Sequence, residues 1–300
     1  MQILKAHEQW FANANASHQA KPEYLRFKDL YTIFQTSMDA ASQQQSEAQY
    51  IIDATTAFNA YKDNIDQWPA SKAFNAQSKF HSTIHEEFWV YIGLEALKRT
   101  TSPTPAHLYL GSGNSLQGLF FHPSSLEEAL GNTVGHTIKP KFKDRDFMIA
   151  LKVPFNLTIN GHNAGIKTRA GINEIFLPLI TIECKQYLDK TMLDNALSAA
   201  TKLKTFSPHT LDIVTIELNK LADVNIAGSG VDGFFVLRKQ RLSEVTYGSS
   251  GPGPKDTVNV QVRNPVDSDV VFRVYDKMKE HLNKTTWHAS VDDFLGNGYL

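Results

Sequence analysis

The chain has 300 residues, of which 42% are hydrophobic, and a formal net charge of −1 from 30 basic and 31 acidic side chains. This balance argues against a non-specific nucleic-acid binder, which is usually strongly basic, so any DNA contact must come from local basic patches. The single cysteine, Cys184, excludes an intrachain disulfide, and no Cys/His zinc spacing is present. Without an apolar run of ~18 residues or the apolar core of a signal peptide, we expect a cytoplasmic protein with no membrane association.

The first 75 residues predict a helical subdomain. Apolar and aromatic side chains recur at helical spacing in two stretches, residues 24–34 and 51–68, which a polar segment at residues 42–46 separates. Pro69 ends the second helix because the residue before a proline is biased away from helical geometry. No chemistry is visible here, and we expect this part to pack on a catalytic core or to contact a partner.

Residues 77–98 predict a stronger helix, with Phe80, Ile84 and Phe88 on one apolar stripe. Glu87 falls beside this stripe, whereas Glu86 falls well away from it. Glu87 is therefore a candidate for a half-buried carboxylate. It is either a surface glutamate paired with a nearby base or a supporting acid of a metal site.

Two glycine-rich strings resemble nucleotide-binding loops but lack the required context. Residues 111–114 (Gly-Ser-Gly-Asn) are not followed by Lys-Ser/Thr, and residues 228–233 match a dinucleotide fingerprint but precede a strand-like run instead of opening a helix. We expect flexible turns at a binding cleft at both places.

The central stretch is the apolar run at residues 176–182, which reads as a strand buried on both faces. It ends in Glu183-Cys184-Lys185. Alternate side chains of a strand share a face, so Glu183 and Lys185 point the same way. Charges at the end of a buried strand are costly unless they are paired or bind a metal. The thiol of Cys184 points the other way, into the core, which argues against a nucleophilic cysteine.

Upstream, four basic residues lie within seven positions, and Asp144 and Asp146 are interleaved with them. Asp146 directly precedes the strand-like residues 147–153, so we favour it over Asp144 as the partner acid of Glu183. Downstream, a helix at 192–205, strands at 211–218, 234–237 and 258–262 and a helix at 265–281 complete the pattern. This order predicts an α/β fold with a mixed central sheet flanked by helices.

The Glu183-x-Lys185 pair with an upstream Asp146 resembles the Asp…(Asp/Glu)-x-Lys signature of the PD-(D/E)xK nuclease superfamily, although no proline precedes the aspartate. The resemblance implies an Mg²⁺ ion held by Asp146, Glu183 and the backbone carbonyl of Cys184, with Glu87 as a supporting ligand from the helix. It implies that Lys185 orients or deprotonates the attacking water. Mg²⁺ prefers oxygen ligands and can supply a nucleophile and charge neutralisation for phosphodiester hydrolysis.

Residues 77–240 look like BbvCI-type restriction endonucleases, which are built from two related subunits. This resemblance implies a catalytic domain at residues 76–300, double-stranded DNA as substrate, and a heterodimer or homodimer. A non-catalytic DNA-binding protein with a relic nuclease core and a repair or recombination nuclease are the alternatives. The candidate phosphate contacts are Lys139, Lys141, Lys143, Arg238, Lys239 and Arg241.

Overall fold

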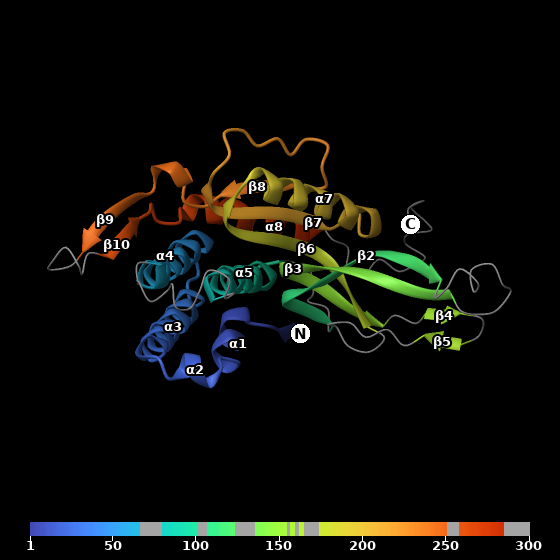
Figure 1. Ribbon diagram of the computed structural model, residues 1–300, viewed down its shortest axis with the longest axis horizontal. Helices are drawn as coiled ribbons and strands as arrows, with labels where there is room; N and C mark the ends of the chain where they lie inside the picture. The colour runs from blue at the N-terminus through green and yellow to red at the C-terminus, as the bar shows by residue number, and fades with distance from the viewer. Residues whose placement is uncertain are drawn as a thin grey trace.

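The computed structural model describes residues 1–66, 80–100, 107–123, 136–154, 157–159, 162–164, 174–250 and 258–284. Its centre is a curled six-stranded mixed sheet with the order β1-β2-β3-β6-β7-β8 (Figure 1). The strands are β1 (Gln2–Ile3), β2 (Leu108–Pro123), β3 (His136–Pro154), β6 (Glu174–Leu188), β7 (Leu211–Asn219) and β8 (Gly233–Val236). β3 pairs antiparallel with both β2 and β6, whereas β6, β7 and β8 run parallel to one another.

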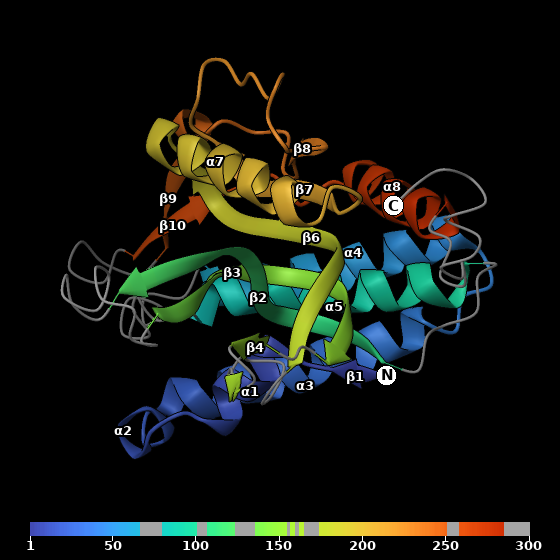
Figure 2. The same ribbon diagram turned by 90° about the vertical axis from the view of Figure 1, so that its right-hand side faces the viewer.

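Helices cover both faces of this sheet (Figure 2). They are α1 (Ala6–Ala12), α2 (Ala16–Gln19), α3 (Pro22–Ala41), α4 (Glu47–Asp66), α5 (Phe80–Lys98), α7 (Lys190–Phe206) and α8 (Ser268–Lys284), with a short 3₁₀ helix, Leu242–Glu244. α7 packs its apolar stripe on one face, against Val214 and Ile216 of β7. On the other face, α5, α8 and the N-terminal helices share one cluster of buried residues with the sheet. No helix among the described residues is long and apolar enough to cross a membrane.

α5 lies at the centre of the larger core, and 15 of its 19 residues are buried. Gly93 allows this helix to approach β3 closely, because a Cβ atom at this position would lie 2.8 Å from the ring of Phe147. Polar residues of α5 are therefore buried together with apolar ones, Glu86 and Glu87 included. The middle of α5 is buried on all sides. The helix therefore does not divide into an apolar stripe facing the core and a polar side facing solvent, as its sequence predicts.

The Gly-Ser-Gly-Asn string, expected to form a turn, instead lies inside strand β2. Gly111 has a φ of +139°, and a Cβ atom there would lie 2.6 Å from Leu4, so the position requires glycine. Gly111 pairs with Met148 and Gly113 with Arg145, so that Asp146 and Phe147 of β3 lie opposite the single residue Ser112. This β-bulge occurs at the predicted catalytic aspartate. Bulges bend a strand and redirect its side chains, and they are frequent next to active sites.

Two small hairpins lie apart from the main sheet, at opposite ends of its long axis (Figure 1). In one, β4 (Leu157–Ile159) pairs antiparallel with β5 (His162–Ala164), and in the other, β9 (Thr246–Ser250) pairs antiparallel with β10 (Val258–Val262). Residues 246–250 therefore belong to a strand. The expected domain boundary near residue 75 lies outside the described residues.

Candidate active site

The predicted strand end at Glu183-Cys184-Lys185 is part of β6, between β3 and β7 in the sheet. Glu183 and Lys185 share a face, as expected, and the Lys185 ammonium lies 2.8 Å from the Glu183 carboxylate. The Glu183 side chain is 15% exposed and that of Lys185 is 30% exposed, so both are accessible from solvent at the edge of the core. The strand therefore presents one acid and one amine side by side.

Asp146 completes this group from the neighbouring strand. Its Oδ2 atom lies 3.0 Å from the Lys185 ammonium and accepts a hydrogen bond of 2.8 Å from the backbone N–H of Cys184. Asp144 pairs in the β2–β3 ladder opposite Asn114, on the far side of the bulge, and is exposed. The structure thus brings together Asp146, Glu183 and Lys185, and it places Asp144 further along the strand.

The electrostatics of the group keep the lysine charged. Burial lowers the pKa of Lys185, but the carboxylates of Asp146 and Glu183 outweigh this effect and raise it above its ordinary value. Lys185 therefore stays protonated, as an ammonium, at neutral pH. Its contact with both carboxylates shows that one cation can touch the two acids at once.

Cys184 lies between the two charged residues with its side chain in the core, as predicted. The thiol is buried, and burial together with the nearby Asp146 raises its pKa well above the ordinary value. A reactive cysteine needs a lowered pKa and exposure. Cys184 is consequently unsuited to nucleophilic catalysis, and its backbone is the part that faces the site.

Glu87, the predicted supporting acid, has a different set of partners. It is fully buried, and its Oε2 atom accepts hydrogen bonds of 3.0 Å from the backbone N–H groups of His7 and Glu8, while Oε1 accepts one of 2.6 Å from the Tyr31 hydroxyl. The first N–H groups of a helix lack internal partners, and an acid placed there satisfies them. One carboxylate oxygen of Glu87 thus caps the start of α1, and the other binds Tyr31 of α3.

The neighbouring acid, Glu86, lies within electrostatic range of the buried Cys184 thiol. Its charge contributes to the raised pKa of Cys184, behind the contributions of burial and Asp146. Glu86 is 9% exposed, although the sequence pattern placed it well away from the apolar stripe. An α5 buried on nearly all sides gives no periodic signal that distinguishes the two glutamates. The sequence pattern therefore favoured Glu87, whose two oxygens the structure gives to α1 and α3.

The predicted phosphate contacts do not share one environment. Lys141, Lys143 and Arg241 are exposed, and Lys239 is 2.6 Å from Asp267. Arg238 is buried, and its Nε atom lies 3.0 Å from Glu217 in a cluster that also holds Lys62 and Asp66 of α4. Arg238 therefore cannot reach a DNA phosphate, and this part of the prediction is wrong. The side chain of Lys139 lies outside the described residues.

The donors available to a cation are oxygens. Within the described residues, no group of three or more His, Cys, Asp or Glu side chains could hold a metal ion. Asp146 and Glu183 offer two carboxylates, and the remaining positions would fall to a backbone carbonyl, water and phosphate. Mg²⁺ characteristically binds one or two carboxylates and keeps several waters. The donor set fits this ion and does not fit zinc, which prefers nitrogen and sulfur.

Residues 77–300 match the Bpu10I restriction endonuclease family. Among curated proteins, no sequence matches the chain. A solved structure described as the native BbvCI A2B2 tetramer at low resolution shares the fold, with a TM-score of 0.62 and 14% identity over 94% of this chain and 97% of that chain. The matched region contains both strands of the site and α5. The chain therefore belongs to the Bpu10I restriction endonuclease family and is a type II restriction endonuclease, which cuts DNA at a specific site.

Proposed function

We propose that this chain is a PD-(D/E)xK-type nuclease whose active site consists of Asp146, Glu183 and Lys185. The observation that carries the proposal is the single ammonium within 3.0 Å of two carboxylates from adjacent strands. The Lys185 ammonium bridges the carboxylates of Asp146 and Glu183 next to the bulge. The same two carboxylates could bind a metal cation, and the ammonium could then contact a phosphate. Asp146, Glu183 and the carbonyl of Cys184 would hold Mg²⁺. Glu86 of α5 replaces Glu87 as the acid that supports the site from the helix.

When bound, Mg²⁺ would lower the pKa of a water molecule and neutralise charge on the phosphate. The chain's own residues supply the rest. Lys185 has a raised pKa and remains an ammonium, so it orients the attacking water and stabilises the charge that develops on phosphate oxygens. The amide N–H of Cys184 holds Asp146 in place through its 2.8 Å hydrogen bond. Lys141 and Lys143, exposed on β3 ahead of Asp146 in the chain, would contact the DNA backbone.

The partner in this proposal is a second subunit. The structure of similar fold is a tetramer of two kinds of chain, named A and B. This chain would supply one site and cut one strand, and a related subunit would cut the other strand of double-stranded DNA. Co-expression with the product of a neighbouring related gene would then give a stable complex.

The test is cleavage of plasmid DNA by the purified complex with Mg²⁺ and with excess EDTA. We expect discrete fragments with Mg²⁺ and intact plasmid with EDTA. Glu183→Gln in this chain alone should convert double-strand cutting into nicking at the same short sequence. Full double-strand cleavage by the Glu183→Gln enzyme, or cleavage at DNA structures instead of a short sequence, would contradict the proposal.

A further inference from the structure

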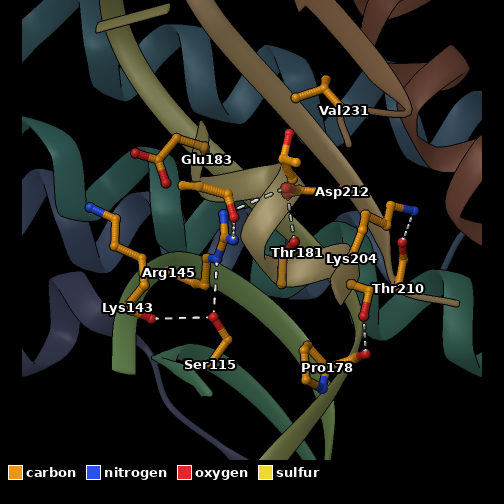
Figure 3. Close-up of polar contacts among 12 residues, drawn as sticks. Ser115, Lys143, Arg145, Pro178, Thr181, Glu183, Lys204, Thr210, Asp212 and Val231 are labelled. Atoms are coloured by element: carbon orange, nitrogen blue, oxygen red, sulfur yellow. Dashed lines mark hydrogen bonds and ion pairs between the residues drawn. The ribbon is translucent and has the colours of Figure 1, made fainter. Parts of the chain in front are cut away.

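Arg145 is a buried arginine next to Asp146 in the chain, with 2% of its surface exposed. Its guanidinium reaches three elements other than its own strand. Nε donates a hydrogen bond of 3.3 Å to Ser115 Oγ on β2, Nη2 donates one of 3.1 Å to the carbonyl of Ala199 on α7, and Nη1 lies 3.6 Å from Asp212 on β7. Figure 3 shows the guanidinium at the centre of these contacts. One side chain of β3 thus joins the sheet to the helix that covers it.

Asp212 is itself held from two sides. Its Oδ1 atom accepts a hydrogen bond of 2.6 Å from Thr181 on β6, and its backbone N–H donates one of 2.7 Å to Asp232. Burial raises the pKa of Asp212 to about 6 against the opposing effects of Arg145 and Thr181, and the charge of Glu183 adds to the increase. Asp212 therefore lies within electrostatic reach of one of the two site carboxylates, and Thr181 belongs to the same strand as Glu183.

Stability alone is a weak explanation for this pair. A buried ion pair often contributes no more than well-packed apolar residues of the same volume would. What an arginine adds is a planar group with donors in fixed directions. Two of these donors make hydrogen bonds here and a third nitrogen forms an ion pair, so the guanidinium is held toward three different elements.

The pair lies next to the bulge in β3. The bulge leaves Asp146 and Phe147 opposite one residue of β2, and such an extra residue interrupts the ladder. Phe147 is fixed by its burial in the core with α5. On the other side of Asp146, Arg145 supplies the corresponding anchor. Asp146 is thus held between two buried side chains that belong to opposite faces of the sheet.

We propose that Arg145, held by Asp212, is the positioning residue that fixes the bulge at Asp146 and thereby sets the spacing between the carboxylates of Asp146 and Glu183. Neither Arg145 nor Asp212 touches DNA or metal in this proposal. It rests on the proposed metal site for its functional consequence, whereas its structural consequence can be measured without metal.

The experiment compares Arg145→Lys with a matched control, Arg238→Lys, in the full chain. Both arginines are buried and bind a carboxylate on β7, but Arg238 lies in the cluster with Lys62. The structural readout is hydrogen exchange at the Cys184 amide, which reports on Asp146 because it donates to it. The functional readout is the Kd for Mn²⁺ alone, followed by electron paramagnetic resonance.

We expect Arg145→Lys to speed exchange at Cys184 about tenfold and to weaken Mn²⁺ binding five- to tenfold. Arg238→Lys should lower Tm at least as much and leave both readouts at the wild-type value. Wild-type exchange at Cys184 in Arg145→Lys, or equal acceleration in both variants, overturns the proposal. If the wild-type protein does not bind Mn²⁺, the metal site fails, and the exchange measurement still decides the role of Arg145.

A milder variant covers the case in which Arg145→Lys does not fold. Ser115→Ala removes one hydroxyl that accepts from Arg145 and leaves both charges in place. We expect about threefold faster exchange at Cys184 with a nearly unchanged Tm. Exchange at the wild-type rate in Ser115→Ala would then count against the proposal.

Discussion

Replacing Glu87 by glutamine is expected to destabilise the fold and to leave DNA cleavage at the wild-type rate. The carboxylate accepts three hydrogen bonds, two at Oε2 from the start of α1 and one at Oε1 from Tyr31. Glutamine keeps one acceptor oxygen and places an NH₂ group where the other stood. In the better orientation it retains the two backbone bonds and loses the charge-assisted bond from Tyr31.

A hydrogen bond to a charged group contributes about 1.5–3 kcal/mol. Burial raises the pKa of Glu87 despite the hydrogen bonds from Tyr31 and Glu8, so removing the charge offsets part of this loss. We therefore expect a decrease of about 2 kcal/mol, which corresponds to a Tm lower by about 4–8 °C. Calorimetry of the purified complex measures this change.

The companion variant is Glu86→Gln, one position away on the same helix. It should raise the Mg²⁺ concentration needed for half-maximal plasmid cleavage while changing Tm little. Loss of cleavage by Glu87→Gln at a temperature well below its Tm would refute the reasoning. That result would return Glu87 to the active site and assign Glu86 a structural role.

Three further results are expected. Lys185→Met should lower the cleavage rate about 10²- to 10³-fold, as removal of one charge-stabilising donor does, with DNA binding retained in a gel-shift assay; cleavage at the wild-type rate would exclude Lys185 from the chemistry. The free energy of unfolding of the wild-type protein, relative to that of Asp212→Asn, should rise as the pH falls from about 6 toward 4. The reason is that the raised pKa of Asp212 makes the folded state bind a proton at a higher pH than the unfolded state does. Denaturant unfolding of both proteins at pH 7 and pH 5 tests this sign, and a decrease at pH 5 would contradict it. Lys62→Met should lower the free energy of unfolding by about 3–5 kcal/mol, because Glu217 is then left buried with one cation fewer. The exposed Lys284→Met should have little effect on stability. Equal changes in the two variants would show that burial of the ion pair does not determine its contribution.

The strand of the candidate site, β6, was predictable because its pattern is local. An apolar run that ends in an acid and a lysine with alternating side chains already defines which two groups share a face, and the structure confirms β6 with Glu183 beside Lys185. The choice of Asp146 over Asp144 followed from its position at the start of an apolar run. These inferences needed only strand periodicity and the penalty for unpaired buried charge.

Other features depend on tertiary packing and left no local signal. The Gly-Ser-Gly-Asn string reads as a turn, yet it forms part of β2, where Leu4 leaves no room for a side chain at Gly111. Arg145, between two aspartates and after three lysines, reads as part of an exposed basic segment. Its burial depends on partners at residues 115, 199 and 212, which no sequence pattern links to it.

The cluster of Lys62, Asp66, Glu217 and Arg238 has a consequence for how this enzyme can be divided. Lys62 and Asp66 come from α4, which lies before the family-matched region at residues 77–300. A fragment that begins at residue 77 would keep Glu217 and Arg238 without Lys62 and Asp66, and it would uncover the aromatic surface of α5. We therefore expect the segment 77–300 to be less stable by itself than in the whole chain, so that a shortened version of the enzyme should retain residues 1–66.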